Sequence, residues 1–351
     1  MEILTTNRLH KSKRAFSTRR VNLDLCTKLK VSDYAPVAGD LVLARIMELG
    51  SHSRIELPTG RRAKLQLGDE VLLAYGNRYA PDQYEAYVPT DLGPCHMVAA
   101  GGVAARAVSW HERLAGPTAV QPIGVVADSE GAAINLGQFS CEDVACAAPP
   151  VAFAVFGSSM NAGKTISAAS LVKGFADTGL CVGALKITGT AAGGDTWLMR
   201  DYGASEVFDF TDAGFTTTFM EPVSEIMAGA ENLMRLLGKS GCDVAVIEVA
   251  DGLYQKETSQ LAAHPALKAM IDGVYFAAND ALGAVTGVSK LKSLGHNVLG
   301  VSGAVMRSPL ASAEAASQLD TPMLHLDDLQ NPDCARGLLD MLYQQRSVAA
   351  E

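Results

Sequence analysis

The segment Gly157-Ser158-Ser159-Met160-Asn161-Ala162-Gly163-Lys164-Thr165 is the most informative part of this chain. It follows the apolar run 151–156 directly and leads into a helical pattern that starts at Ile166. A strand, a glycine-bounded loop ending in Gly-Lys-Thr and a helix together form a phosphate-binding loop, in which backbone N–H groups converge on phosphate oxygens. Residues 157–166 are therefore predicted to bind a nucleoside triphosphate.

Two side chains of this loop have predicted roles. In such loops the lysine ammonium reaches the outer phosphates and the threonine hydroxyl ligates Mg²⁺. Lys164 and Thr165 occupy these positions. The commonest spacing has a glycine six residues before the lysine, where this chain has Ser158, so the loop is one residue longer than usual.

Composition narrows the class of protein. A length of 351 residues suggests two domains, and 48% hydrophobic residues are ample for sizeable cores. No apolar run approaches the roughly 20 residues that span a bilayer, so a cytoplasmic protein with no membrane partner is expected. The net charge of −9 argues against general nucleic-acid binding. The seven cysteines, Cys141 and Cys146 included, lack a compact zinc spacing and are expected to be free thiols.

Residues 1–30 are basic although the chain as a whole is acidic. This segment has only Glu2 and Asp24 as acids against eight bases: Arg8, Lys11, Lys13, Arg14, Arg19, Arg20, Lys28 and Lys30. It is interpreted either as a basic arm for a polyanion or partner, or as a solvated segment that flanks strands, and the second interpretation is preferred.

The pattern of short apolar runs divides the chain into a basic N-terminal segment (1–35), a β-rich domain (36–148) and an α/β domain (149–351). The β-rich domain is predicted to be a small barrel or sandwich. Its expected strands are 41–47, 54–57, 63–67, 70–75, 103–110, 123–126 and 132–136. The polar segment 76–85 is interpreted as a substrate-facing loop or, preferably, as a hairpin loop packed by its tyrosines.

Residues after 150 alternate between strand and helix patterns, which predicts a mostly parallel sheet with right-handed crossovers. The fold class is therefore α/β, a P-loop NTPase domain preceded by the β-rich domain. The expected strands are 151–156, 181–187, 206–210, 243–249, 273–278, 297–302 and 322–325. The expected helices are 164–178, 195–203, 223–239, 281–294, 309–318 and 334–346.

Charged residues follow several of these strands, at the edge where ligands of parallel sheets bind. Glu248 ends a hydrophobic strand and is a candidate Mg²⁺ ligand, with Asp251 as the competing candidate. Lys186 and Thr190 suit an anionic substrate or a transferring phosphoryl group. Asp195 is either a metal ligand or an ordinary helix N-cap, and its position alone favours the cap.

These segments together resemble dethiobiotin synthetase and its relatives over residues 151–330. The family loop also has the pattern G-x₅-G-K-T, and its Lys-Pro-x-x-Ser-Gly segment is similar to Lys186-Ile187-Thr188-Gly189-Thr190. Its metal-binding aspartate matches Asp195. Its Phe-x-Glu-Pro segment and acid-ended strand are similar to 219–222 and 247–252. The family has an acidic residue where Asn161 stands, and it has no counterpart of the β-rich domain.

The resemblance implies an enzyme of the ligase type that uses ATP and Mg²⁺. Such an enzyme activates a small carboxylate or carbamate by phosphoryl transfer for attack by an amine, with Lys164, Lys186 and Glu248 catalytic. It also implies Thr165, Asp195 and Glu248 around the metal and Lys186 and Thr190 around the substrate. A homo-oligomer, dimer or higher, is expected. Two alternatives stay open: an acyltransferase that acts on an amino acid with coenzyme A in the loop, and a switch-type ATPase with a protein partner.

Overall fold

The computed structural model describes residues 1–145 and 149–350 and divides into two compact units. The first unit consists of Met1–Glu142, Gly189–Gly194 and Phe210–Glu221. The second consists of Asp143–Thr188, Asp195–Asp209 and Pro222–Glu351. The predicted limit after residue 148, and Cys146 with it, lie outside the described residues.

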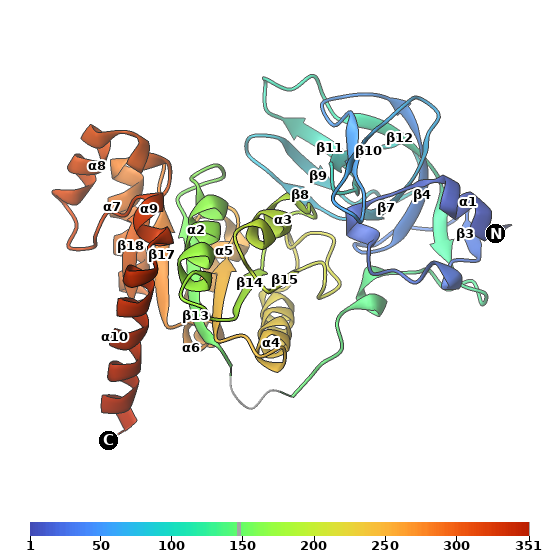
Figure 1. Ribbon diagram of the computed structural model, residues 1–351. Helices are drawn as coiled ribbons and strands as arrows, with labels where there is room; N and C mark the ends of the chain where they lie inside the picture. Colours follow the sequence, from blue (N-terminus) through green and yellow to red (C-terminus); the bar gives the residue numbers. More distant parts are fainter. Residues whose placement is uncertain (146–148, 351) are drawn as a thin grey trace. The chain divides into compact units, whose positions relative to one another are not determined.

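Within residues 1–145, five strands of the first unit form a closed ring (Figure 1). In ring order they are β4 (Leu41–Glu48), β7 (Glu70–Tyr75), β11 (Val103–Trp110), β10 (Cys95–Ala99) and β12 (Thr118–Ala127), which returns to β4. The β7–β11 pair is parallel and the other four are antiparallel. Closure leaves these strands without free edges, so of the two architectures expected from the sequence, barrel or sandwich, the structure has the barrel.

Further short elements surround the ring. They are β1 (Glu2–Ile3), α1 (Thr6–Lys11), β2 (Lys13–Arg14), η1 (Phe16–Thr18), η2 (Leu23–Leu25), β3 (Lys28–Lys30), β5 (Arg54–Glu56), β6 (Arg62–Lys64), β8 (Arg78–Tyr79), β9 (Tyr84–Tyr87) and η3 (Leu136–Phe139). The expected strand at 132–136 is wrong, since Ala133 and Asn135 form only isolated bridges. The prediction fails for a local reason, because the Asn135 side chain accepts a hydrogen bond from Gly137 N and begins η3.

Strand β4 is buried on both faces. Val42, Ala44 and Ile46 belong to one core cluster, whereas Leu41 and Leu43 belong to another. The second cluster also contains apolar residues of the N-terminal segment, such as Leu4, Leu9 and Val21. Alternate side chains of a strand point to opposite faces, so the N-terminal segment covers the outer face of the barrel at β4.

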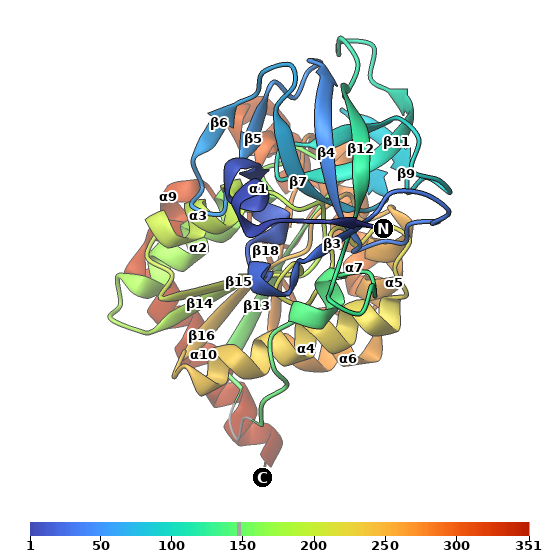
Figure 2. The same ribbon diagram turned by 90° about the vertical axis from the view of Figure 1, so that its right-hand side faces the viewer.

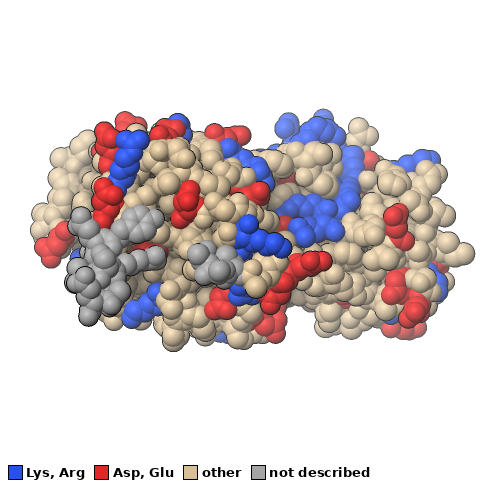
Figure 3. All heavy atoms as spheres, turned by 60° about the horizontal axis from the view of Figure 1, so that its bottom comes forward, with Lys and Arg blue, Asp and Glu red and all other residues tan. Residues whose placement is uncertain are grey.

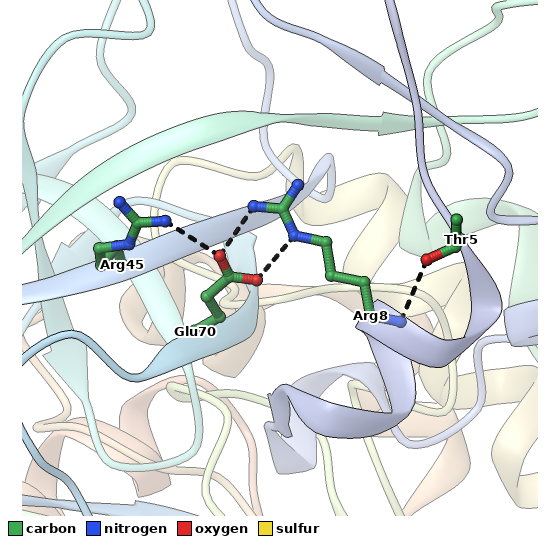
Figure 4. A network of polar contacts seen from close by, with 4 residues as sticks. All are labelled: Thr5, Arg8, Arg45 and Glu70. Atoms are coloured by element: carbon green, nitrogen blue, oxygen red, sulfur yellow. Dashed lines mark hydrogen bonds and ion pairs between the residues drawn. The ribbon is translucent and has the colours of Figure 1, made fainter.

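The basic N-terminal segment is held by ion pairs and backbone carbonyls. Arg8 donates two hydrogen bonds of 2.8 and 2.7 Å to the Glu70 carboxylate, which also accepts one of 3.2 Å from Arg45 (Figure 4). Lys13 pairs with Asp69, and Arg14 donates to three carbonyl oxygens. In Figure 3 the largest group of blue Lys and Arg side chains lies just to the right of the centre of the view. These contacts match the strand-flanking interpretation of residues 1–30.

The second unit contains a parallel sheet of six strands within the described residues. In spatial order they are β15 (Glu206–Asp209), β14 (Val182–Lys186), β16 (Val244–Glu248), β13 (Val151–Gly157), β17 (Gly273–Ala277) and β18 (Val298–Ser302). After β13 the chain first forms β14, which lies on one side of β13 in the sheet, and later forms β17, which lies on the other side of β13. Ligands of such sheets bind at the carboxyl end of the strand where this reversal occurs, which here is β13. The α/β fold of P-loop NTPases is confirmed.

Helices cover both faces of this sheet (Figures 1 and 2). On one face α2 (Lys164–Ala176) packs with α9 (Leu326–Gln330) and α10 (Pro332–Ala350), and the rings of Phe153 and Phe175 stack at 5.0 Å. On the opposite face α4 (Val223–Lys239) brings Leu237 against Gly183. The remaining elements are α3 (Gly194–Asp201), α5 (Lys256–Ala263), α6 (Pro265–Met270), α7 (Ala281–Ser293), η4 (Ala304–Arg307) and α8 (Pro309–Ala316).

The seventh strand expected at 322–325 is wrong. Met323 forms only an isolated parallel bridge with Val301. The extended segment stops there because His325 caps α9, its N–H donating to Asp328 at 2.7 Å.

Two general features of the described residues complete the fold. No disulfide joins their cysteines. None of their helices has both the length and the apolar character needed to cross a membrane.

Two buried tyrosines of the first unit give a matched stability test. The Tyr75 hydroxyl has no hydrogen-bond partner among the described residues, whereas the Tyr84 hydroxyl donates to Gly116 O at 3.1 Å. Tyr75→Phe is expected to leave the free energy of unfolding unchanged or raise it by up to about 1 kcal/mol, while Tyr84→Phe lowers it by about 1 kcal/mol. Urea unfolding of both variants checks this order, which a larger loss in Tyr75→Phe would contradict.

Candidate active site at the phosphate-binding loop

The loop between β13 and α2 has a backbone that requires glycine at two positions. A Cβ on Gly157 would lie 2.7 Å from Lys164 Cγ, and one on Gly163 would lie 2.9 Å from Gly303 Cα. Gly163 also has φ +99°, in the left-handed region that favours glycine. Asn161 has φ +62°, which asparagine tolerates better than most residues. The sequence pattern therefore corresponds to real steric demands.

Three neighbouring segments hold this loop in place. Ser158 N donates to Ala277 O at the end of β17, and Leu253 N donates to Gly157 O, both at 2.9 Å. Ala304 N donates to Ala162 O at 2.9 Å. The loop is thus fixed by the segments that follow β16, β17 and β18, at the carboxyl ends of these strands.

Lys164 lies buried over its own loop. Its ammonium donates to Ser159 O at 2.8 Å, and 6% of the residue is exposed. Burial lowers the pKa of Lys164, while the carboxylates of Glu248 and Asp251 act in the opposite direction. The lysine is therefore a desolvated cation, a state that strengthens its attraction to a phosphate.

Strand register places Glu248 between the strand of the loop and the strand that ends in Lys186. Glu248 lies beside Val155 of β13 on one side and Lys186 of β14 on the other. Its Oε1 accepts a hydrogen bond of 2.9 Å from the Thr165 hydroxyl, and its buried Oε2 has no partner among the described residues. Burial raises the pKa of Glu248, and the ammonium of Lys186 opposes this effect.

Lys186 forms an ion pair with Asp195, the second residue of α3. Asp195 therefore lies inside the first helical turn, and the expectation that it is an N-cap is wrong. Burial alone would lower the pKa of Lys186, but Asp195 and then Glu248 act against it, and the net effect is a raised pKa. Lys186 thus stays protonated at neutral pH.

Asp209 is a neighbour that sequence reasoning missed. It lies opposite Lys186 in the β14–β15 register, is 1% exposed, and contributes to the raised pKa of Lys186. Its only signal in the sequence is its place at the end of the predicted strand 206–210. The register that puts it beside Lys186 is a tertiary property.

Two other candidates occupy different positions. Thr190 belongs to the first unit, where it forms an isolated bridge with Thr217, so its substrate role stays a prediction. Asp251 has φ +65°, and a Cβ on the following Gly252 would lie 2.8 Å from Ser158 O. Asp251 therefore lies next to the loop and remains an alternative to Glu248.

The oxygen atoms around Thr165 fit a small hard cation. The Thr165 hydroxyl and the Glu248 carboxylate are within hydrogen-bond distance, and Glu248 Oε2 has capacity for a further partner. Mg²⁺ prefers oxygen ligands and takes one or two from protein with the rest from water and phosphates. No group of three or more His, Cys, Asp and Glu side chains in the described residues could hold a metal, so this pair would depend on such outer ligands.

A cavity of about 290 Å³ adjoins the loop at Ser158. Tyr254, Phe276, Asp280 and Thr286 contribute to its lining. Leu253 and Leu282 add further apolar surface, so the walls combine apolar side chains with a few polar groups. This combination is typical of small-molecule sites.

Comparisons with known proteins add little to this geometry. No protein-family model matches the chain, and no curated protein matches it. Among solved structures, the signal recognition particle receptor FtsY from Elizabethkingia anophelis is similar over 53% of this chain and 64% of that protein, with a TM-score of 0.37 and 14% identity. The chain thus spans less than two thirds of that protein.

Two further FtsY structures are similar at the same level. Chloroplast FtsY from Physcomitrella patens has a TM-score of 0.38 and 14% identity, over 57% of this chain and 70% of that one. FtsY from Mycoplasma mycoides has a TM-score of 0.34 and 18% identity, over 52% of this chain and 60% of that protein. Similarity of this degree assigns no activity to the chain.

The Thr165–Glu248 hydrogen bond gives a pH-dependent prediction. Thr165→Val removes the donor and is expected to lower the free energy of unfolding by about 1–3 kcal/mol at neutral pH, whereas Thr165→Ser keeps the donor and most of the stability. Losing the donor raises the folded-state pKa of Glu248 further. The deficit is therefore small at acidic pH, where Glu248 is protonated, and grows as the pH rises through its folded-state pKa.

Urea unfolding followed at several pH values measures this difference. A deficit of Thr165→Val that is independent of pH would contradict the role given to Glu248.

Proposed function

We propose that this chain is an ATP-dependent enzyme that activates a small carboxylate or carbamate by phosphoryl transfer for attack by an amine. One observation carries the proposal: the buried, oppositely charged groups Lys164, Lys186 and Glu248 meet at the phosphate-binding loop. The resemblance of residues 151–330 to dethiobiotin synthetase supports ATP as the nucleotide and a ligase as the class of enzyme.

The loop 157–166 binds the phosphates in this proposal. Its backbone N–H groups and the N-terminus of α2 supply partial positive charge, and Lys164 supplies a full one. Because the glycine contacts and the three hydrogen bonds to neighbouring segments fix the loop, these donors need little rearrangement when phosphate binds. Pre-oriented donors are the main source of catalysis in phosphoryl transfer.

Thr165 and Glu248, with Asp195 beside Lys186, would hold Mg²⁺. When it is bound, the metal would neutralise negative charge on the phosphate oxygens. The unpartnered Oε2 of Glu248 supports this assignment, because a buried carboxylate oxygen without a partner is costly unless a cation or donor completes it.

Lys186 would bind the acceptor. Its raised pKa keeps the ammonium charged, so it attracts an oxyanion and holds it toward the loop. Asp195 pairs with this ammonium, and Asp209, which lies beside Lys186 in the β14–β15 register, adds a second negative charge that favours its protonated form. Thr190 is retained as a second substrate residue on the strength of the resemblance alone.

Lys164→Ala should abolish nucleotide binding. Wild-type protein is expected to show a higher melting temperature with ATP and Mg²⁺ than with either alone, because a ligand that binds only the folded state stabilises it. Lys164→Ala should lose this increase, and Lys173→Ala, an exposed lysine of the same helix paired with Asp177, should keep it. Stabilisation of the wild type by coenzyme A and none by ATP would favour the acyltransferase instead.

Lys186→Met and Glu248→Gln should separate binding from turnover. Each is expected to bind ATP within a few-fold of wild type while turnover falls ~10²-fold or more, since these groups act on developing charge. The assay is ADP release with a panel of small carboxylic and amino acids and mass detection of products. Turnover within threefold of wild type in both variants, or wild-type products that form only with coenzyme A, would refute the proposal.

A further inference from the structure

Cys181 and Cys242 lie next to each other at the amino end of the parallel sheet. Cys181 directly precedes β14, and Cys242 lies two residues before β16, the neighbouring strand (Figure 2). Their sulfur atoms are 3.6 Å apart, with the Cys181 thiol donating to Cys242 Sγ. The two residues are 61 positions apart in the sequence, so the fold of the second unit brings their thiols together.

The backbone holds the two cysteines at a separation that suits a disulfide. Cys181 N donates to Asp243 Oδ2 at 2.9 Å, and Asp243 N donates to Cys181 O at 2.8 Å. Cys181 is therefore fixed opposite Asp243, one residue from Cys242. Neighbouring strands with one residue of stagger place Cα atoms roughly 6 Å apart, inside the range found in disulfides. The sulfurs then need only small side-chain rotations to form a bond of about 2 Å.

The two thiols differ in their access to solvent. Cys181 is half-buried, whereas Cys242 is buried. Burial raises the pKa of Cys242, and its hydrogen bond with Cys181 acts in the same direction. A dissolved oxidant therefore reaches Cys181 first, and Cys242 is placed to attack the oxidised Cys181 sulfur from inside the protein.

Metal binding is the other common role of two adjacent cysteines. Structural zinc takes four protein ligands, mostly Cys and His. In the part of the chain that the structure describes, no group of three or more His, Cys, Asp and Glu side chains could hold a metal. The pair has no third ligand of this kind among those residues, which favours oxidation chemistry over a metal site.

We propose that Cys181 and Cys242 are a redox-sensitive pair that oxidises to a disulfide and cross-links β14 to β16. With glutathione disulfide as the oxidant, the Cys181 thiolate attacks one of its sulfurs and expels one glutathione thiolate. The Cys242 thiolate then attacks Cys181 Sγ and expels the second. The two protein thiols give up two electrons and two protons, and glutathione disulfide becomes two molecules of glutathione.

This cross-link joins the two strands that carry buried charges of the candidate site. β14 ends at Lys186 and β16 ends at Glu248, and these residues are neighbours in the register. A disulfide restricts the unfolded chain between its ends, and the effect grows with the length of the closed loop, here 61 positions. The oxidised second unit is therefore more stable than the reduced one. The inference does not depend on nucleotide binding or on the proposed reaction.

Peptide mapping of the full-length protein tests for the bond directly. Reduced protein is equilibrated with excess glutathione disulfide in the presence of a chelator, and remaining thiols are blocked with N-ethylmaleimide. Trypsin releases residues 174–186 and 240–256 as peptides with one cysteine each. Mass spectrometry is expected to find these peptides joined, and dithiothreitol to separate them. The oxidised protein should melt about 5–10 °C higher than the reduced protein.

Single variants separate the two steps of the reaction. In Cys242→Ala, Cys181 should stop at the mixed disulfide with glutathione, because the second attacking thiol is missing. In Cys181→Ser, the buried Cys242 should stay reduced. The control Cys334→Ser removes an exposed cysteine of α10 and should form the bond as the wild type does. The melting temperature under reducing conditions shows whether each variant is folded, and the wild-type mapping decides the question without them.

Any of three results contradicts the proposal. The first is that peptides 174–186 and 240–256 of the wild type stay separate after equilibration with the oxidant. The second is that Cys181 and Cys242 each carry their own glutathione in the wild type. The third is that the joined peptides form but the oxidised protein melts no higher than the reduced protein.

Discussion

The register of the parallel strands β13, β16 and β14 is the constraint on which the second unit depends. It places Glu248 between Val155 and Lys186, so that a carboxylate and an ammonium are buried side by side. Taking either charge out of water alone is expensive, and removal of one partner leaves the other uncompensated. The loop, α2 and α3 supply the remaining members, Thr165, Lys164 and Asp195. A register shift of one residue would move every one of these side chains relative to its partner.

Sequence reasoning reached the elements of this unit because their signals are local. The run 151–156, the Gly-Lys-Thr ending and the apolar run before Glu248 each specify a strand or loop without reference to the rest of the chain. The expectation failed at 322–325, where a capped helix competes for the same residues, and at 132–136, where an asparagine side chain starts a short helix. Closure of the barrel depends on pairings between distant strands, which no local pattern encodes.

The candidate site residues also divide into those that a local sequence pattern identifies and those that depend on contacts between distant segments. Thr165, Lys186, Asp195 and Glu248 were all expected from the sequence, and the structure gives their partners: an ion pair for Asp195 in place of a helix cap, and a hydroxyl donor for Glu248. Asp209 was not identified, because its significance comes from its neighbour Lys186 on another strand.

The first unit is built from three separate segments of the chain, which has a consequence for when it can fold during synthesis. Gly193 N donates to Glu56, 137 residues away, and the Thr217 hydroxyl donates to Asn77 O, 140 residues away. Both Gly189–Gly194 and Phe210–Glu221 belong to this unit. A nascent chain that ends before residue 221 therefore lacks part of it, although the barrel strands are complete by residue 127. Domains usually fold as they leave the ribosome, but here the N-terminal unit is finished only after half of its neighbour's strands have been made.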